Sequence, residues 1–315
     1  MRLRGTDFGD VFGASGVQGF FGEGYWFHTP LRPFGLDFEG MTLVSKTATL
    51  EANVGNMPLT EFYTPRDLFP DCIKIQPWRG AALNAVRLSN PGLRALLDTG
   101  LWQMRTEPFL ISFMSLADTP EKRLDEFRAA VDMLGPAKDD FCAPFGFQPN
   151  LSCPNTGHKP SELIGESAKV LEVAAKLGVP VVPKYSIASA PVEAVLELNQ
   201  NPNCDAICIS NTVPWGWHGI NWEGVWGSKN SPLAKLGGGG FSGATLKPFV
   251  CEWVSKLRKA GFTKPINGGG GIFSRNDIWD YRSAGASSVF LGSVAMLRPW
   301  RVRGLIKEAN RLVWE

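Results

Sequence analysis

The amino-acid sequence predicts an α/β fold, a (β/α)8 TIM barrel of parallel strands with a small N-terminal capping segment. Short apolar runs alternate with longer amphipathic segments along the chain, and such alternation gives a parallel sheet. About eight runs without a break in composition favour closure of that sheet into one barrel. We therefore expect a single domain over residues 1–315, with its chemistry on the loops at the carboxyl ends of the strands.

The expected strands are short, rich in β-branched or aromatic residues, and bounded by Gly, Pro or Asn. They cover Thr42–Lys46, Phe109–Ser115, Phe147–Ser152, Val179–Ser186, Ala206–Ser210, Pro265–Gly268 and Ser288–Ser293. The expected helices repeat apolar residues every three or four positions. They cover Pro120–Leu134, Ser161–Leu177, Ala190–Asn199, Leu246–Lys259, Arg275–Ala284 and Trp300–Trp314.

Two segments do not fit a plain barrel. Residues 1–40 are expected to form irregular or short β structure that caps the amino end of the barrel. Residues 213–240 are expected to be a Trp- and Gly-rich insertion loop, because residues 214–227 hold four of the 11 tryptophans. Such an aromatic loop can pack under the barrel rim, form a lid or make an oligomer contact.

Composition and charge exclude several classes of function. The chain is 44% hydrophobic and 20% charged, and its formal net charge is +2. This balance does not suit a nucleic-acid partner, and the absence of a run of about 18 apolar residues excludes a membrane span. The six cysteines form no Cys-x-x-Cys pair, so no metal site is expected. The start of the chain lacks the apolar segment of a signal peptide, and we expect reduced thiols in a cytoplasmic protein.

The segment NLSCPNTGHKP, residues 150–160, directly follows a predicted strand. Taken alone, Cys153 could be a packed small side chain, a metal or redox thiol, or a group positioned for proton transfer. The missing second cysteine at a suitable spacing argues against the metal and redox roles.

Glycine turns follow the last two predicted strands, in INGGGGIFSRND and SSVFLGSVAML. Backbone N–H groups at such turns can point at an anion, and glycine lets the backbone approach it closely. Tight turns between strand and helix would give the same glycines, but two on adjacent strands favour a phosphate site. The dinucleotide fingerprint is not convincing, and a mononucleotide such as FMN fits better.

Several motifs occur in a fixed order: GASG at residues 13–16, SKTATLEANVGNMP at 45–58, Asn84, NLSCPN at 150–155, Lys184, SNT at 210–212 and the glycine turns. With them, the chain resembles the dihydroorotate dehydrogenases from about Gly13 to Arg298. It looks most like their soluble class, in which the catalytic base is a cysteine. The resemblance implies that Cys153 takes the proton from C5 of dihydroorotate while the hydride from C6 goes to flavin N5.

The resemblance also implies the positions that contact FMN and substrate. Those for FMN are Ala14, Ser15, Gly16, Lys46, Thr47, Asn150, Lys184, Ser210, Gly243, Gly270, Gly271, Gly292 and Ser293. Those for the substrate are Lys46, Asn84, Arg87, Leu88, Asn150, Asn155, Asn211 and Thr212. Asparagine suits a pyrimidine edge because its amide offers both a donor and an acceptor.

The sequence departs from the family at Arg87, where the motif after Asn84 commonly has a glycine. Two alternatives stay open: the side chain crowds the substrate, or it adds a cation for a different acidic ligand. Alternatives therefore stay open: a flavin-dependent reductase or dehydrogenase of another pyrimidine or unsaturated acid, or a flavin-binding subunit without turnover.

The resemblance leaves the electron acceptor open. The segment CPNTGHKP looks nearer the branch that forms a stand-alone homodimer and uses fumarate, so a fumarate-like acceptor is expected. The other branch passes electrons through a partner subunit with FAD and an iron–sulfur cluster to NAD.

Overall fold

A computed structural model describes residues 1–34, 36–151 and 160–314. Eight parallel segments form its centre, and every neighbouring pair is bridged by backbone hydrogen bonds. Around the ring they are β3 (Val11–Gly13), residues 42–44, β6 (Phe109–Phe113), β7 (Phe145–Pro149), residues 181–185 ending in β8 (Lys184–Tyr185), β9 (Ile207–Ile209), β12 (Ile266–Gly268) and β13 (Ser288–Leu291). Because β13 also pairs with β3, the ring closes, and the predicted barrel is confirmed.

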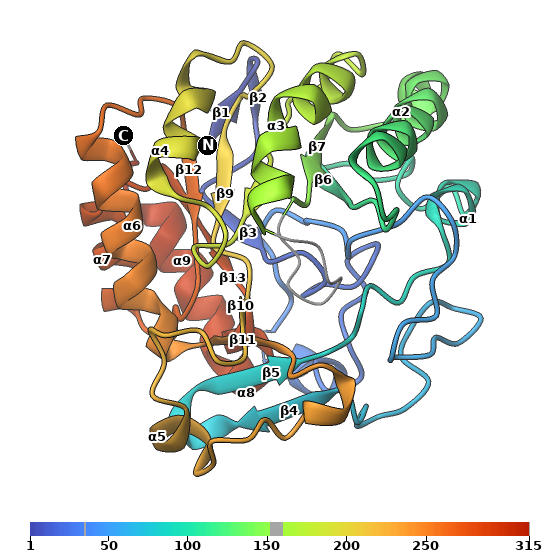
Figure 1. The fold of residues 1–315 in the computed structure, drawn as a ribbon. Coiled ribbons are helices and arrows are strands. Elements are labelled where there is room, and N and C mark those ends of the chain that lie inside the picture. Colours follow the sequence, from blue (N-terminus) through green and yellow to red (C-terminus); the bar gives the residue numbers. More distant parts are fainter. Residues whose placement is uncertain (35, 152–159, 315) are drawn as a thin grey trace.

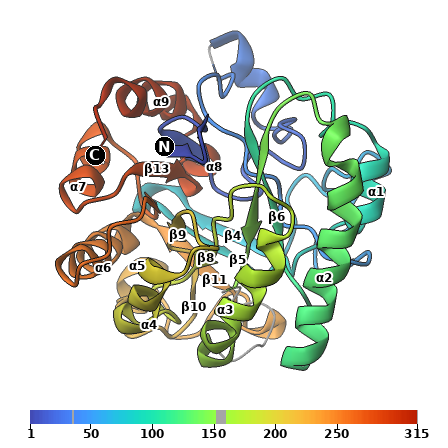
Figure 2. The ribbon, with the colours of Figure 1, turned by 90° about the horizontal axis from the view of Figure 1, so that it is seen from above.

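Helices surround this barrel, as the view from above shows (Figure 2). They are α1 (Leu93–Asp98), α2 (Pro120–Ala137), α3 (Pro160–Ala175), α4 (Val192–Leu196), α6 (Lys247–Lys259), α7 (Arg275–Ser283), α8 (Ser293–Leu297) and α9 (Val302–Arg311). The start of α2 follows the sequence, since Thr119 Oγ1 accepts a hydrogen bond from Lys122 N and Pro120 occupies the first turn. Short 3-10 turns are η1 (Thr29–Phe34), η2 (Pro77–Arg79), η3 (Lys138–Asp140), η4 (Glu197–Gln200), η5 (Ala234–Leu236), η6 (Ala244–Leu246) and η7 (Pro299–Arg301).

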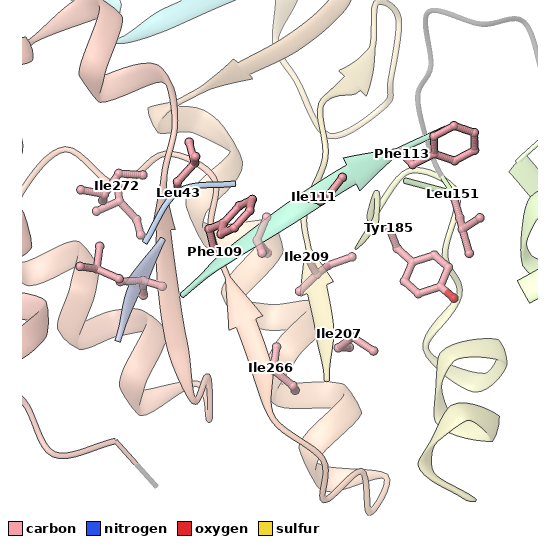
Figure 3. Close-up of a cluster of buried hydrophobic side chains, with 14 of the residues drawn as sticks. Leu43, Phe109, Ile111, Phe113, Leu151, Tyr185, Ile207, Ile209, Ile266 and Ile272 are labelled. Atoms are coloured by element: carbon pink, nitrogen blue, oxygen red, sulfur yellow. The ribbon is translucent and has the colours of Figure 1, made fainter. Parts of the chain in front are cut away.

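Alternation along the strands separates the core between barrel and helices from the barrel interior. On β6, Phe109, Ile111 and Phe113 are buried beneath the helices (Figure 3). The ring of Phe113 packs edge-on against that of Phe127 on α2, with centroids 5.2 Å apart. Leu110 lies between them in sequence and belongs to the separate cluster inside the barrel. Burial of each such side chain contributes about 1.5–3 kcal/mol.

The first residues close the amino end of the barrel. A hairpin of β1 (Arg2–Leu3) and β2 (Thr6–Asp7) places Leu3 and Phe8 in the interior cluster, and it lies far from β4 and β5 in Figure 1. The expectation that residues 1–40 are all cap was wrong for Val11–Gly13, which is a barrel strand. This strand has only three residues, too few to show the alternation by which a strand is recognised in a sequence.

A second, antiparallel sheet covers the carboxyl end, with the strand order β10-β11-β5-β4. Its strands are β10 (Val213–Pro214), β11 (Gly240–Gly243), β5 (Ala81–Asn84) and β4 (Ile73–Gln76). The Trp-rich insertion between β10 and β11 contains α5 (Trp222–Trp226) and is not a simple loop. The rings of Trp215 and Trp222 are tilted by 35° with centroids 4.2 Å apart, and Trp222 meets Phe241 of β11 edge-on. The tryptophans therefore pack against the sheet at the barrel rim.

Among the described residues, no helix has the length and apolarity needed to cross a membrane.

Candidate active site

A cavity of about 320 Å³ opens at the carboxyl end of the barrel. That volume is in the range of small-molecule sites. The cavity brings together seventeen residues that the sequence singled out: Ala14, Ser15, Gly16, Lys46, Thr47, Asn84, Arg87, Leu88, Asn150, Lys184, Ser210, Asn211, Thr212, Gly270, Gly271, Gly292 and Ser293. Positions almost 280 residues apart (293 minus 14) meet because parallel strands deliver their carboxyl ends to one rim.

A chain of polar side chains crosses the cavity wall. Ser15 Oγ lies 2.8 Å from Thr47 Oγ1, which accepts from Asn150 Nδ2 at 3.3 Å. Asn150 Oδ1 accepts from Asn211 Nδ2 at 3.1 Å, and Asn211 Oδ1 accepts from the N–H of Thr212 at 2.9 Å. These contacts fix which face of each amide carries the donor, so the amide pair is oriented by the protein's own groups.

Lys46 lies at one side of the cavity. Its ammonium donates to Ser89 O and sits 4.9 Å from the centroid of the Phe20 ring. Burial lowers the pKa of Lys46 to about 7. A Cβ on Gly16, whose φ is +88°, would lie 3.3 Å from Lys46 Cγ, so a glycine lets the two strand ends approach this closely.

Lys184 supplies a second cation from β8, where its side chain is 6% exposed. The thiol of Cys208 lies close enough for Lys184 to act on its charge, but burial raises the pKa of Cys208 to about 12. Cys208 therefore stays a neutral thiol beside Lys184.

The glycine turns form another end of the cavity. Gly270 and Gly271 have φ values of +132° and +75°, conformations that glycine adopts without a steric penalty. In the described part of the chain, the backbone N–H groups of Gly270, Gly271 and Ser293 have no acceptor. A Cβ on Gly292 would lie 3.2 Å from Ala14 Cβ. Unpaired donors beside crowded glycines fit an anionic group such as a phosphate.

The structure places Gly243 differently from the expectation that it contacts the ligand. Gly243 does not line the cavity; it lies in β11 behind the glycine turn. A Cβ on Gly271 would lie 2.5 Å from Gly243 O, and one on Gly243 would lie 2.3 Å from Gly80 O. Gly243 therefore allows three backbone segments to pack, and it supports the turn.

Cys153 and Asn155 lie outside the described residues, as does the rest of the segment 152–159. Their neighbour Asn150 directly follows β7 and lines the cavity, and α3 begins at Pro160. The expectations for Cys153 and Asn155 therefore stay predictions.

Sequence reasoning missed an aromatic wall of the cavity, formed by Tyr25, Trp26, Phe27 and His28. Tyr25 donates its hydroxyl to Gly16 O at 2.6 Å, and burial raises its pKa. His28 Nδ1 accepts from Tyr25 N at 3.1 Å and Nε2 donates to Ala295 O at 2.9 Å, which is the neutral tautomer. Burial lowers the pKa of His28 and favours that form. The aromatic run in FGEGYWFHTP was the signal that could have identified this wall.

The family model for dihydroorotate dehydrogenase matches residues 4–312. The chain belongs to the dihydroorotate dehydrogenase family. Enzymes of this family are flavoproteins, and this protein is an oxidoreductase that acts on a CH–CH bond.

Curated relatives are similar over most of their length. Two are named dihydroorotate dehydrogenase B (NAD(+)), catalytic subunit. The one from Bacillus pumilus is 26% identical over 85% of this chain and 78% of its own length. The one from Caldicellulosiruptor bescii is 27% identical over 92% of this chain and 85% of its own length. A crystal structure of DHODH from Eimeria tenella in complex with ferulenol has a TM-score of 0.70 and 19% identity, and covers 98% of this chain and 82% of that one. This last similarity supports the fold.

Proposed function

We propose that this protein oxidises dihydroorotate to orotate with bound FMN, as a step of pyrimidine biosynthesis. The observation that carries the proposal is one cavity that joins an oriented amide pair, two lysines and a glycine-lined anion site. An amide pair suits the ring edge of a pyrimidine, and the anion site suits the phosphate of a mononucleotide.

The cavity residues fit FMN. Gly270, Gly271, Gly292 and Ser293 would hold its phosphate with backbone N–H groups, while Lys46 and Lys184 would lie beside its ring system. When bound, the flavin supplies the acceptor for the hydride that leaves C6 of the substrate. The lysine charges stabilise negative charge that develops at this end of the cavity, which lowers the barrier to transfer.

The side chains have distinct tasks toward the substrate. Asn150 and Asn211 hold the pyrimidine edge in one orientation, because each amide is already fixed by a neighbour. Cys153 is proposed to take the proton from C5, so that a proton and a hydride leave adjacent carbons. A thiol has a reference pKa of about 8.5, so the reactive thiolate fraction and the reduction rate increase with pH.

The names of the curated relatives support a proposal for the electron acceptor. The fumarate-like acceptor that CPNTGHKP suggested is the weaker candidate, since the curated relatives are named as catalytic subunits of an NAD(+) enzyme. We propose NAD(+) as the final acceptor, reached through a partner subunit. Reoxidation of the reduced protein by fumarate alone would reverse this choice. The homodimer and the cytoplasmic location stay predictions.

The decisive experiment mixes the purified, flavin-loaded protein with dihydroorotate without oxygen. Loss of the yellow flavin absorbance supports the proposal. Colour that persists with dihydroorotate but bleaches with dihydrouracil or succinate assigns the cavity to another substrate. Colour that persists with all three compounds supports a flavin-binding subunit without turnover. Failure to take up flavin after reconstitution contradicts the proposal of a flavin-dependent enzyme.

Replacement of the proposed base gives the first mutational prediction. Cys153→Ala is expected to bind flavin and orotate but to slow flavin reduction by about 100-fold or more, since general-base catalysis contributes about 10²–10⁴-fold. Rapid-mixing absorbance measures the reduction rate. Cys142→Ala removes an exposed cysteine away from the cavity and is the matched control. Equal reduction rates for the two variants would remove Cys153 as the base.

A further inference from the structure

Arg87 lines the cavity at the position where the family commonly has a glycine, and its side chain is exposed at the mouth. The backbone shows which conformation a non-glycine residue adopts at this position. Arg87 and the adjacent Leu88 both have a φ of +54°, in the left-handed region that glycine prefers. Non-glycine residues in this region are concentrated at functional sites, where the surroundings hold them.

The surroundings of Arg87 hold this backbone firmly. Asn53 Nδ2 donates to Arg87 O at 2.6 Å and to Leu88 O at 3.1 Å. Asn90 Nδ2 donates to Leu88 O at 2.7 Å. A Cβ on Gly55 would lie 2.7 Å from Arg87 O, so that glycine packs directly against the segment. These contacts within the protein therefore hold the left-handed turn.

The Trp-rich insertion supports the side chain of Arg87. Gly237, Gly238 and Gly239 form a turn with φ values of +86°, +93° and +84°. A Cβ on Gly237 would lie 3.5 Å from Arg87 Nη2, which places the guanidinium along this turn. The turn rests on Trp215, since a Cβ on Gly238 would lie 3.2 Å from Trp215 Cβ. The guanidinium thus lies beside the insertion.

The charges of the cavity favour an anion at this point. Lys46 and Lys184 also face the cavity, and Asp67 is the acidic residue in its lining. Over residues 1–34, 36–151 and 160–314, Arg87 has no ion-pair partner, and neither does Asp67. An exposed guanidinium on the cavity lining is suited to a carboxylate, which it can bind with two parallel hydrogen bonds.

We propose that the Arg87 guanidinium binds the carboxylate of the ring substrate and so determines specificity for a ring acid over an uncharged ring. The inference rests on the proposed function in assuming that a pyrimidine-like ring occupies the cavity. It also gives the insertion a role, because Trp215 packs against the glycine turn beside which Arg87 lies.

The test measures ligand binding to the flavin-loaded protein through changes in flavin absorbance. Orotate carries the carboxylate, and uracil is the same ring without it. Arg87→Ala is expected to weaken orotate about 10- to 100-fold and to change uracil binding less than about twofold. Arg87→Lys should fall between wild type and Arg87→Ala, because it keeps the charge and loses the planar fork.

Lys235→Ala is the matched control. Lys235 is an exposed cation on the same insertion, two residues before Gly237, and does not line the cavity. Its removal should leave orotate affinity within about twofold, because exposed charges act weakly at a distance. The affinity of wild type for orotate should fall with added salt, and that dependence should be smaller in Arg87→Ala.

Several results would overturn the inference. Equal losses for orotate and uracil would mean that Arg87 acts through the fold, and tighter orotate binding in Arg87→Gly would mean that the side chain crowds the ring. Orotate that fails to bind wild type would also overturn it. The two proposals fail separately: flavin reduction by dihydroorotate with the same KM in wild type and Arg87→Ala contradicts only the role of Arg87. Orotate binding that depends on Arg87, without flavin reduction by dihydroorotate, contradicts only the proposed reaction.

Discussion

Lys46 shows how a single residue links the fold to the charge of the cavity. Its ammonium lies against the Phe20 ring and bonds one backbone carbonyl. Burial costs the charged form free energy, which is why the pKa falls from 10.5 to about 7. Near neutral pH the amine therefore changes charge easily, and an anionic ligand in the cavity would favour the protonated form.

The stability of the flavin-free protein should depend on pH through Lys46. Between about pH 7 and 10.5 the unfolded chain holds a proton on Lys46 that the folded chain has lost. The free energy of unfolding should therefore rise with pH in this window, and the penalty is present in full below pH 7. Urea denaturation at several pH values measures it.

Lys46→Met should flatten the pH dependence in that window, while Lys256→Met, which removes an exposed cation of α6, should leave it unchanged. The same slope in Lys46→Met and in wild type would show that another group is responsible.

At the scale of secondary-structure elements, α2 and α3 are joined by a buried ion pair. Arg123 on α2 is 2% exposed and donates through Nε to Glu166 Oε2 of α3 at 2.9 Å. Its Nη2 bonds the other carboxylate oxygen, and Nη1 donates to Asp118 O at 3.0 Å. This pair therefore joins two neighbouring helices of the outer layer.

Loss of one partner should destabilise the protein strongly. Arg123→Ala leaves Glu166 without its charged partner, and we expect the free energy of unfolding to fall by about 3–5 kcal/mol. Arg128→Ala breaks an exposed pair with Asp125 on the same helix and should cost about 0–1 kcal/mol. Chemical denaturation separates the two. A double variant with Glu166→Ala should recover part of the loss, and no recovery would mean that packing outweighs the charge.

The elements differ in how well the sequence predicts them, for physical reasons. The barrel strands that lead to Lys184, Ser210 and the glycine turns are buried apolar runs that end in polar residues or glycine. The sequence pattern therefore predicts both the strands and the position of these residues at the rim. By contrast, Ile73–Gln76 is half exposed and pairs with β5 at a sheet edge, which leaves no clear alternation. The wall residue His28 depends on a hydrogen bond to Ala295, 267 positions away, which no local pattern contains.

At the scale of the whole molecule, the barrel interior divides into two ends with different chemistry. The amino end holds apolar side chains of the strands and of the N-terminal hairpin, with Leu3 and Phe8 in the same cluster as Phe12 and Leu110. The carboxyl end holds the amide pair, the lysines and the cavity. Apolar packing at one end can therefore supply stability while polar groups at the other end stay available to ligands.

This division predicts that stability and ligand binding can be changed separately. Phe8 is 1% exposed, and Phe8→Ala should lower the free energy of unfolding by about 3–5 kcal/mol through lost burial and a residual cavity. Affinities for flavin and orotate should stay within about twofold at temperatures where the variant is folded, because Phe8 does not line the ligand cavity.

Thermal or urea unfolding and flavin titration, made on the same preparation, measure the two effects. Phe62→Ala removes a ring that is 76% exposed and should change neither stability nor affinity appreciably. If Phe8→Ala weakened flavin binding many-fold while its unfolding curve matched wild type, the two ends would be coupled through the strands. The interior would then act as one unit that transmits packing changes to the ligand end.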